Sequence, residues 1–261
     1  MIPKSFDVVG NIAILKFDNN FKQKEKISVA NELLKQHSSI RTVLEKSGKF
    51  SGRLRKMKTV YLAGEKTKTA VYRENACIFK FDIDETYFSP RLSNERNEIA
   101  KQVNKNESVL VLFAGVAPFS IVIAKIAKPK VVYSVEINRV ASKYAVENVK
   151  LNKVENIVKV IQGDVKKVIP KLIVNEKIKF DRIVMARPQL KDTFLDFAFK
   201  IVKKGGIINY YGFANDSEEV VESIKREAAI AKKKIKITLI KKAGDIAPFR
   251  YRWRVDLRVI N

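Results

Sequence analysis

The first third of the chain carries strand-like and helix-like hydrophobic patterns in turn. Residues 6–17 are apolar and β-branched on both sides of Gly10–Asn11, which predicts a strand or a hairpin there. Apolar residues then recur at helical spacing between lysines, so we expect an amphipathic helix over residues 22–37. Residues 40–83 are rich in strand-forming residues separated by turns. The pattern therefore predicts a small, basic α/β domain over residues 1–78.

From Asn106 onward the pattern changes to strands that alternate with helices. Short apolar runs separated by amphipathic segments predict a parallel, doubly wound sheet. We expect helices after the first strand, after Asn138 as an N-cap, and after Asp216 or Ser217. The strands are expected at residues 109–113, 131–137, 158–163, 180–185 and 206–212.

The end of the chain alternates apolar and polar residues twice, over 235–239 and 249–259, with a turn at 243–248 between them. Two such strands joined by a short turn predict an antiparallel hairpin at the end of the parallel sheet. This combination is more typical of methyltransferases than of dehydrogenases. We therefore predict an α/β fold with a Rossmann-like class I methyltransferase sheet over residues 79–261. The arginines of the last strand form either a nucleic-acid-binding face or an ordinary solvated face.

Charge narrows the class of partner. Lysine and arginine outnumber aspartate and glutamate by 52 to 28, which gives a formal net charge of +24 over 261 residues. Such an excess concentrates polyanions around a protein. A lysine-rich surface from heat adaptation is the alternative, but that adaptation usually raises both signs together, and here only the basic side is high. The charge therefore favours nucleic acid as the partner.

Cysteine, histidine and apolar runs exclude several classes of protein. The single cysteine, Cys77, excludes an internal disulfide framework, and the single histidine, His37, argues against a histidine metal site. The N-terminus lacks the pattern of a signal peptide, and the longest uncharged run, residues 108–124, is too short for a membrane span. We expect a monomeric cytoplasmic protein with no metal and no membrane partner.

Three strand ends carry residues suited to a nucleotide-like ligand. Gly115 permits a tight turn after the first strand, and the following helix presents free N–H groups. Glu136 ends the second strand about 20 residues later, where a carboxylate can accept hydrogen bonds from ribose hydroxyls. Asp164 follows the third strand and can accept from an adenine amino group. Taken alone, each of these three residues is equally well explained as an ordinary turn or cap residue. Together, at the ends of three successive strands, they predict a cofactor site.

Five segments follow one another along the chain: YRENACIFKFDIDETYFSPRLSNER, VLFAGVAPFSI, EINRVASKYAVENVKLNKVEN, GDV and GGIINYY. In this order and spacing they resemble the tRNA guanine-37 N1-methyltransferases, a family that includes enzymes of the wyosine pathway. The resemblance extends over roughly residues 50–261. It implies S-adenosylmethionine as the cofactor and tRNA, at position 37 of the anticodon loop, as the substrate.

The resemblance also implies roles for individual residues. Glu95 is expected to be the general base that removes the N1 proton of guanine, although an acid in the first helical turn also suits the helix dipole. Arg55 is expected to stabilise negative charge on O6 of the base, as a second catalytic residue. Tyr87, Arg187 and Pro188 are expected to bind the substrate, with a surface salt bridge as the alternative for Arg187. The expected cofactor-binding residues are Ser89, Arg91, Arg96, Phe113, Ala114, Gly115, Glu136, Ile137, Asp164 and Val165.

The chain departs from the family pattern in several places. Val111 replaces an acidic residue of the first motif and Ala117 a glycine of the second, which we expect to reshape the cofactor turn slightly. The segment MARPQL, residues 185–190, replaces the family's Asn-x-Pro, so recognition of the target base must differ. The chain is also shorter than relatives that grip tRNA with an additional N-terminal domain. The lysines of residues 46–58 are the expected substitute.

These departures suggest the wyosine-associated branch of the family. Some of its members methylate N1 of guanine-37 and also C7 of 4-demethylwyosine, the tricyclic imidazopurine made from it. One alternative is the aminocarboxypropyl transferase of the same pathway, which uses the same cofactor. A second alternative is a tRNA-binding protein that has kept the fold without the activity.

Overall fold

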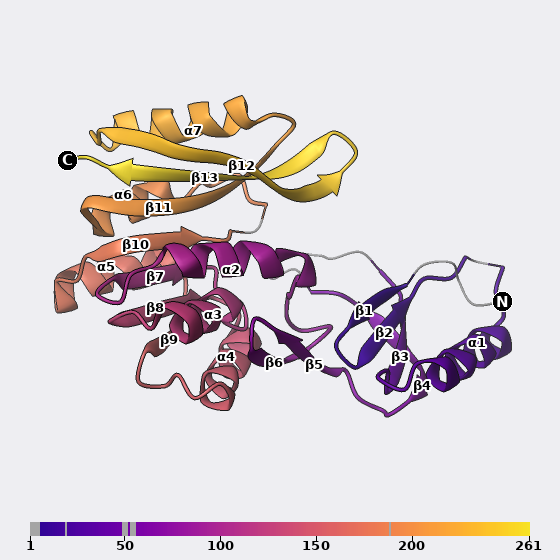
Figure 1. The fold of residues 1–261 in the computed structure, drawn as a ribbon. Helices are drawn as coiled ribbons and strands as arrows, with labels where there is room; N and C mark the ends of the chain where they lie inside the picture. The colour runs from indigo at the N-terminus through magenta and orange to yellow at the C-terminus, as the bar shows by residue number, and fades with distance from the viewer. Residues whose placement is uncertain (1–5, 19, 49–51, 53–55, 188) are drawn as a thin grey trace.

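The computed structural model describes residues 6–18, 20–48, 52, 56–187 and 189–261. An N-terminal α/β domain lies to one side of a larger domain built on a seven-stranded sheet (Figure 1). A two-stranded sheet lies between them. No helix in these described ranges is both long enough and apolar enough to cross a membrane.

The N-terminal domain is a four-stranded sheet with one helix. Strand β1 (Asp7–Val9) forms an antiparallel hairpin with β2 (Ile12–Leu15), as the pattern around Gly10 predicts. Helix α1 (Gln23–Gln36) leads to β3 (Thr42–Lys46), which pairs parallel to β2 and antiparallel to β4 (Thr59–Gly64). The buried face of α1 packs on this sheet, which confirms the predicted amphipathic helix.

The small sheet of β5 (Thr69–Glu74) and β6 (Cys77–Asp82) connects the two domains. On one side, the Asn11 side chain accepts a hydrogen bond from the Val71 N–H at 2.7 Å. The adjacent Gly10 has φ of +60°, and a Cβ there would lie 2.0 Å from the Val71 carbonyl oxygen, so this contact requires glycine. The division placed at residue 78 falls within β6.

The larger domain contains the predicted parallel sheet and hairpin. Its strand order is β12-β13-β11-β10-β7-β8-β9, in which the five strands from β11 to β9 are parallel. Strand β13 is antiparallel to β11 and to β12, which confirms the C-terminal hairpin. The elements, in chain order after β6, are η1 (Pro90–Leu92), α2 (Ser93–Gln102), β7 (Ser108–Leu112), α3 (Pro118–Ala127), β8 (Val131–Glu136), α4 (Arg139–Leu151), β9 (Val158–Gln162), α5 (Val165–Glu176), β10 (Phe180–Met185), α6 (Leu195–Ile201), β11 (Val202–Ala214), α7 (Ser217–Ile230), β12 (Ile235–Ala247) and β13 (Arg250–Val259).

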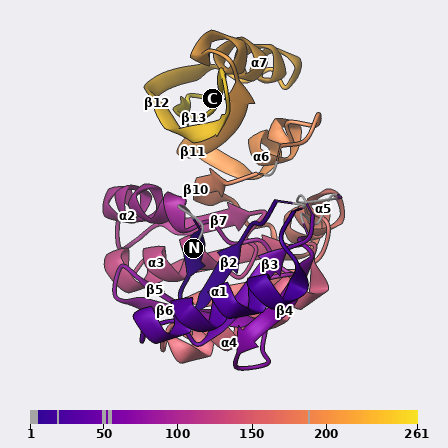
Figure 2. The ribbon, with the colours of Figure 1, turned by 90° about the vertical axis from the view of Figure 1, so that its right-hand side faces the viewer.

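Alternate residues of the central strands enter two cores on opposite faces of the sheet. Val109 and Val111 of β7 pack with residues of α2, α3 and α4, whereas Leu110 and Leu112 pack with residues of α5, α6 and α7. Figure 2 shows α2 and α3 on one side of the sheet and α5 and α6 on the other. Burial on both faces explains why the parallel strands read as continuous apolar runs.

The centre of the arginine face of the last strand is covered. Arg252 and Arg254 are 8% and 1% exposed, and β13 lies inside the sheet between β11 and β12. Glu95 and Glu98 of α2 pair with Arg254 across this face. The predicted solvated face is therefore wrong for these two arginines, and Arg254, which is paired with acids of this chain, is not open to a nucleic acid.

Candidate active site

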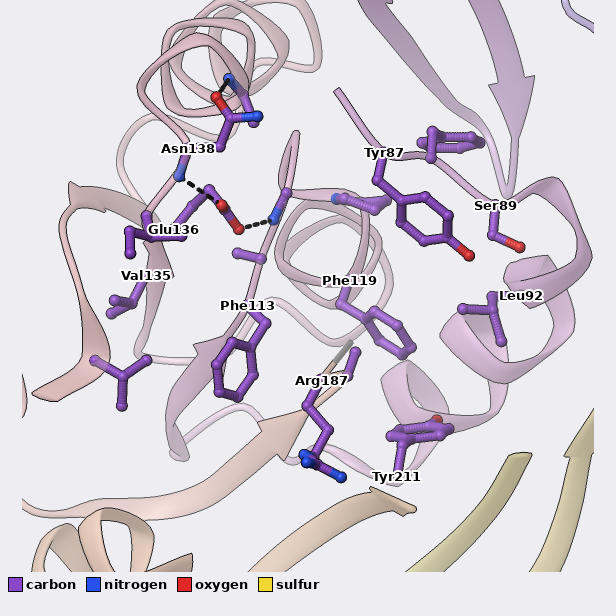
Figure 3. Close-up of a pocket in the computed structure, with 18 of the residues that line it drawn as sticks. Tyr87, Ser89, Leu92, Phe113, Phe119, Val135, Glu136, Asn138, Arg187 and Tyr211 are labelled. Atoms are coloured by element: carbon purple, nitrogen blue, oxygen red, sulfur yellow. Dashed lines mark hydrogen bonds between the residues drawn. The ribbon is translucent and has the colours of Figure 1, made fainter. Parts of the chain in front are cut away.

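A pocket opens at the carboxyl ends of β7, β8, β9 and β10, where ligands bind to doubly wound sheets (Figure 3). Its empty space, with the open mouth included, is about 1110 Å³. The expected cofactor residues Ser89, Arg96, Phe113, Ala114, Gly115, Glu136, Ile137, Asp164 and Val165 all line it, as do Tyr87 and Arg187. The fold therefore brings together most of the residues that the sequence analysis selected.

The turn between β7 and α3 forms one wall of the pocket in a left-handed backbone conformation. Phe113, Gly115 and Ala117 have φ of +60°, +57° and +66°. Ala117 stands at the position where the family pattern has glycine, and a left-handed alanine costs about 1 kcal/mol. The turn therefore keeps a conformation suited to glycine, with strain at Ala117. Pro118 at the first helical position fits the start of α3.

Glu136 is held at the end of β8 by backbone donors. Its two carboxylate oxygens accept hydrogen bonds from the N–H groups of Gly115 and Asn138, each at 2.7 Å (Figure 3). Burial raises the pKa of Glu136, and these backbone hydrogen bonds oppose that shift. Each carboxylate oxygen has a second acceptor position. The carboxylate is therefore oriented to receive two further donors, such as a pair of ribose hydroxyls.

Asp164 has a structural role beside its place in the pocket. Its side chain caps α5 by accepting a hydrogen bond from the Lys166 N–H at 2.9 Å. Apolar side chains at this end of the pocket, from Phe113, Ile137 and Val165, provide flat walls for an aromatic ring. Asp164 also lines the pocket, beside Val165.

The three expected cofactor residues after β6 lie in different surroundings. Arg96 is 1% exposed, pairs with Glu74 and donates to the Ser89 carbonyl oxygen at 3.0 Å, so its guanidinium fixes the segment that carries Ser89. Arg91 is exposed, lies 3.8 Å from Asp7, and is absent from the lining of this pocket. Arg91 faces a second cavity instead.

Glu95 lies behind the pocket wall rather than on it. Its carboxylate is buried and accepts a hydrogen bond from the Tyr211 hydroxyl at 3.0 Å. It also pairs with Lys241 and Arg254, each at 2.9 Å. Tyr211 itself lines the pocket (Figure 3). The expected base is thus separated from the pocket by one hydroxyl group.

The remaining expected substrate residues are less fully described. One guanidinium nitrogen of Arg187 donates to the carbonyl oxygens of Leu190 and Asp192, and its buried Nε has no partner among the described residues. Arg187 thus stabilises the loop that contains Leu190 and Asp192, and it also lines the pocket. Arg55 and Pro188 lie outside the described residues.

Tyr211 and Arg252 line the pocket, although the sequence patterns gave neither a role in it. Tyr211 lies within the GGIINYY segment, so the signal was present but the tyrosine was not assigned a role. Arg252 lines the pocket from β13, although it lies 50 residues beyond Val202, where the last parallel strand, β11, begins. Only the pairing of β13 with β11 brings it there.

Comparisons with known proteins agree with this geometry. The sequence model of the TRM5/TYW2 methyltransferase domain matches residues 70–239, and that of the TYW2 N-terminal domain matches residues 1–67. A tRNA (guanine(37)-N(1))-methyltransferase, Trm5b of Pyrococcus abyssi, is 34% identical over 99% of this chain and 76% of its own length. The tRNA (guanine(37)-N(1))/4-demethylwyosine(37)-methyltransferase Taw22 of Nanoarchaeum equitans is 33% identical over 98% of this chain and 100% of its own length.

Solved structures give the same result for the fold. The structure of TYW2 from Methanocaldococcus jannaschii in complex with AdoMet superimposes with a TM-score of 0.76. It covers 98% of this chain and 100% of that one, at 26% identity. The domain match spans most of the chain, and the sequence relatives align with nearly all of it. The protein is therefore a member of the TRM5/TYW2 methyltransferase family.

Proposed function

We propose that this protein transfers the methyl group of S-adenosylmethionine to N1 of guanine-37 in the anticodon loop of tRNA. The observation that carries this proposal is that two features lie side by side. A pocket has acidic residues at the ends of β8 and β9, and one of its lining residues, Tyr211, is hydrogen-bonded to the buried Glu95. The first feature suits a nucleoside cofactor and the second a substrate that must lose a proton.

The residues of the pocket fit S-adenosylmethionine. Glu136 offers acceptors to the ribose hydroxyls, and Asp164 offers one to the adenine amino group. The apolar walls from Phe113, Ile137 and Val165 suit the adenine ring. When bound, the cofactor supplies an electrophilic methyl group on a sulfonium.

The protein's own contribution to the chemistry is proton removal and positioning. Guanine N1 carries a proton near neutral pH and becomes nucleophilic when the proton leaves. The proton can pass to the Tyr211 oxygen while the Tyr211 hydroxyl proton passes to Glu95, so that no charge accumulates on the tyrosine. Arg254 and Lys241 hold the glutamate in place for this transfer. Positioning of base and methyl group supplies much of the remaining acceleration.

The residue that follows β10, Ala186, favours methylation of a base larger than guanine. Ala186 lines the pocket where the family pattern has a base-contacting asparagine. A methyl side chain in place of an amide leaves more room and removes two hydrogen-bonding groups. This favours C7 of 4-demethylwyosine as a second methyl acceptor, the activity named for the Nanoarchaeum equitans relative.

The proposed partner is tRNA, bound by a monomer. The net charge of +24 suits a polyanion, and Lys46 and Arg91 line the cavity between the two domains. Sedimentation of the protein with and without one equivalent of tRNA tests the monomer, because a second protein copy would raise the mass of the complex.

A labelling experiment tests the activity. The purified protein is incubated with tRNA that carries guanosine or 4-demethylwyosine at position 37, and with cofactor labelled separately on the methyl and on the aminocarboxypropyl carbons. Methyl label in the nucleoside supports the proposal, and digestion locates the position. Label from the aminocarboxypropyl chain would replace the proposal with transfer of that group. Absence of both labels would identify a binding protein.

A further inference from the structure

A second cavity adjoins the cofactor pocket and lies between the two domains. The two cavities share Tyr87, Phe88, Ser89 and Arg252 as lining residues. The walls of the second cavity also come from β1 of the N-terminal domain, through Val9, and from the end of β12, through Ile246. A molecule in the second cavity can therefore meet a ligand in the first at the boundary where Arg252 lies.

Arg252 differs from the other buried arginines of the described chain. Arg96 pairs with Glu74, Arg182 with Glu107, and Arg254 with Glu95 and Asp256, whereas Arg187 donates to backbone carbonyls. Arg252 is 8% exposed, and its side chain makes no hydrogen bond or ion pair with any described residue. Its guanidinium lies over the Phe213 ring, 5.5 Å from the centroid.

The side chain of Arg252 has no acceptor in the described chain and lies at the boundary of the two cavities, so a ligand there can supply one. The acids of the second cavity do not provide it. Asp7 lies beside Arg91 at 3.8 Å, and Asp245 pairs with Lys242 at 2.7 Å. The guanidinium lies over the Phe213 ring, and its planar fork of N–H donors suits a planar ligand with two neighbouring acceptors.

The position of Arg252 in the sheet separates it from the ribose end of the cofactor pocket. Strand β13 is four strand spacings from β8, which carries Glu136, or roughly 19 Å across the sheet. The ends of β7 and β10, where Phe113 and Ala186 line the pocket, lie between them. Arg252 is thus on the side of the pocket away from Glu136, where the proposed function requires the methyl acceptor.

We infer that Arg252 binds the O6 and N7 edge of the target purine and selects for it. This inference rests on the proposed function, since it names the residue that reads the base in the same site. A guanidinium fork fits O6 and N7 of guanine in a bidentate arrangement. The edge is adjacent to N1, so an arginine at the boundary of the two cavities can hold it while N1 faces the cofactor pocket. Arg252 would thereby supply base contacts where Ala186 supplies none.

A substrate change and a side-chain change together test this inference. Methyl transfer is measured as kcat/KM on tRNA with guanosine or 7-deazaguanosine at position 37, for the wild type, Arg252→Ala, Arg252→Lys and Arg258→Ala. The wild type is expected to lose about tenfold on removal of N7. Arg252→Ala is expected to lose at least tenfold on guanosine and to treat the two tRNAs alike. Arg252→Lys keeps the charge without the fork and should also treat them alike.

Two controls separate the roles that Arg252 could have. Arg258 is an exposed arginine of β13 outside both cavities, and its alanine variant should retain the wild-type preference. The dissociation constant for S-adenosylmethionine, measured by calorimetry, should not change in Arg252→Ala.

Several results would overturn the inference. Equal use of both tRNAs by the wild type would show that N7 is not read, and this measurement does not depend on any variant folding. Retained discrimination in Arg252→Ala and Arg252→Lys would assign the contact elsewhere. Weaker cofactor binding with intact discrimination would assign Arg252 to the cofactor carboxylate. Absence of methyl transfer by the wild type on guanosine would instead overturn the proposed function.

Discussion

The hydroxyl of Tyr211 donates to Oε2 of Glu95 at 3.0 Å and thereby joins the pocket to an acid buried behind it. Burial raises the pKa of Tyr211 well above its ordinary value, and the neighbouring charge of Glu95 adds to this. The phenol therefore stays protonated at neutral pH and serves as a hydrogen-bond donor. Tyr211 can accept a proton from the base only if it transfers its own hydroxyl proton to Glu95 at the same time.

Tyr211→Phe is expected to lower kcat for methyl transfer by about 100-fold, since it removes the group through which the proton reaches Glu95. Glu95→Gln should cause a similar loss, and the double variant should be no slower than the worse single one. The dissociation constant for S-adenosylmethionine should stay within about twofold in each case. Tyr133→Phe is the matched control, because Tyr133 packs in the core on the opposite face and its hydroxyl accepts from Lys159. Normal turnover in Tyr211→Phe would exclude this route for the proton.

Arg254 is expected to be essential for folding stability. Its guanidinium is 1% exposed and pairs with Glu95 and Asp256, at 2.9 and 3.0 Å. Arg254→Met would leave Asp256 without its cation and Glu95 with Lys241 alone, at a cost of about 3–5 kcal/mol in the free energy of unfolding. Urea denaturation measures this cost, with Arg258→Met as an exposed control. A loss below about 1 kcal/mol would mean that Lys241 and water compensate.

The order of the elements in the fold could be read from local patterns. The apolar runs before Gly115, Glu136 and Gly163 predicted β7, β8 and β9, because strands buried on both faces need continuous apolar residues. The Asn138 cap and the start of α7 after Asp216 were also predicted, since side-chain capping is a local interaction. The domain division at residue 78 stays a prediction, as do the roles of the individual site residues.

Long-range pairing accounts for what the sequence did not reveal. The alternation of apolar and polar residues placed Arg252 and Arg254 on one face of a strand. Only the three-dimensional structure shows that this face is covered. Glu95 could be assigned from a motif, whereas its hydrogen bond to Tyr211 joins residues 116 positions apart. No local pattern specifies such a pair.

The side chains of Asn148, in α4, and Asn152, the residue after this helix, take the place of a neighbouring strand for β6. The Asn148 side chain accepts from the Lys80 N–H at 2.7 Å and donates to the Lys80 carbonyl at 3.0 Å. Asn152 makes the same pair of bonds with Ile78. Asn148→Ala would leave buried backbone groups unpaired, which costs about 1–3 kcal/mol in the free energy of unfolding.

The measurement for Asn148→Ala is urea denaturation combined with hydrogen exchange. The Lys80 amide should exchange faster in the variant, because its acceptor is gone. Asn104→Ala is the control, since Asn104 is exposed and bonds only Glu107 in its own loop. Unchanged exchange at Lys80 would show that α4 does not hold β6 through this side chain.

Cys77 gives the stability of the protein a dependence on alkaline pH. Burial raises the pKa of this thiol to about 11, above its value in the unfolded chain. The unfolded chain therefore loses the thiol proton at lower pH than the folded protein does. The contribution of Cys77 to stability is complete below about pH 9 and is lost as the pH rises toward 11.

Comparison of the wild type with Cys77→Ala isolates this effect from other titrating groups. The difference in unfolding free energy between the two proteins should shrink by about 2 kcal/mol between pH 8 and 11. Alkylation of the native thiol by iodoacetamide should also be slow below about pH 9 and fast in urea. Rapid alkylation of the native protein at pH 8 would contradict the burial of Cys77.

Salt should weaken tRNA binding steeply if the basic surface carries the affinity. Each phosphate neutralised by a lysine or arginine releases a counterion, so the logarithm of the association constant falls linearly with the logarithm of the salt concentration. With about six contacts, affinity should fall by roughly 10³-fold between 50 and 200 mM salt. Filter binding measures this slope, and S-adenosylmethionine affinity provides the internal control, because its pocket is mainly apolar and should respond weakly. A flat response of tRNA binding would mean that the net charge of +24 is not directed at the RNA, and that the base contacts carry the affinity instead.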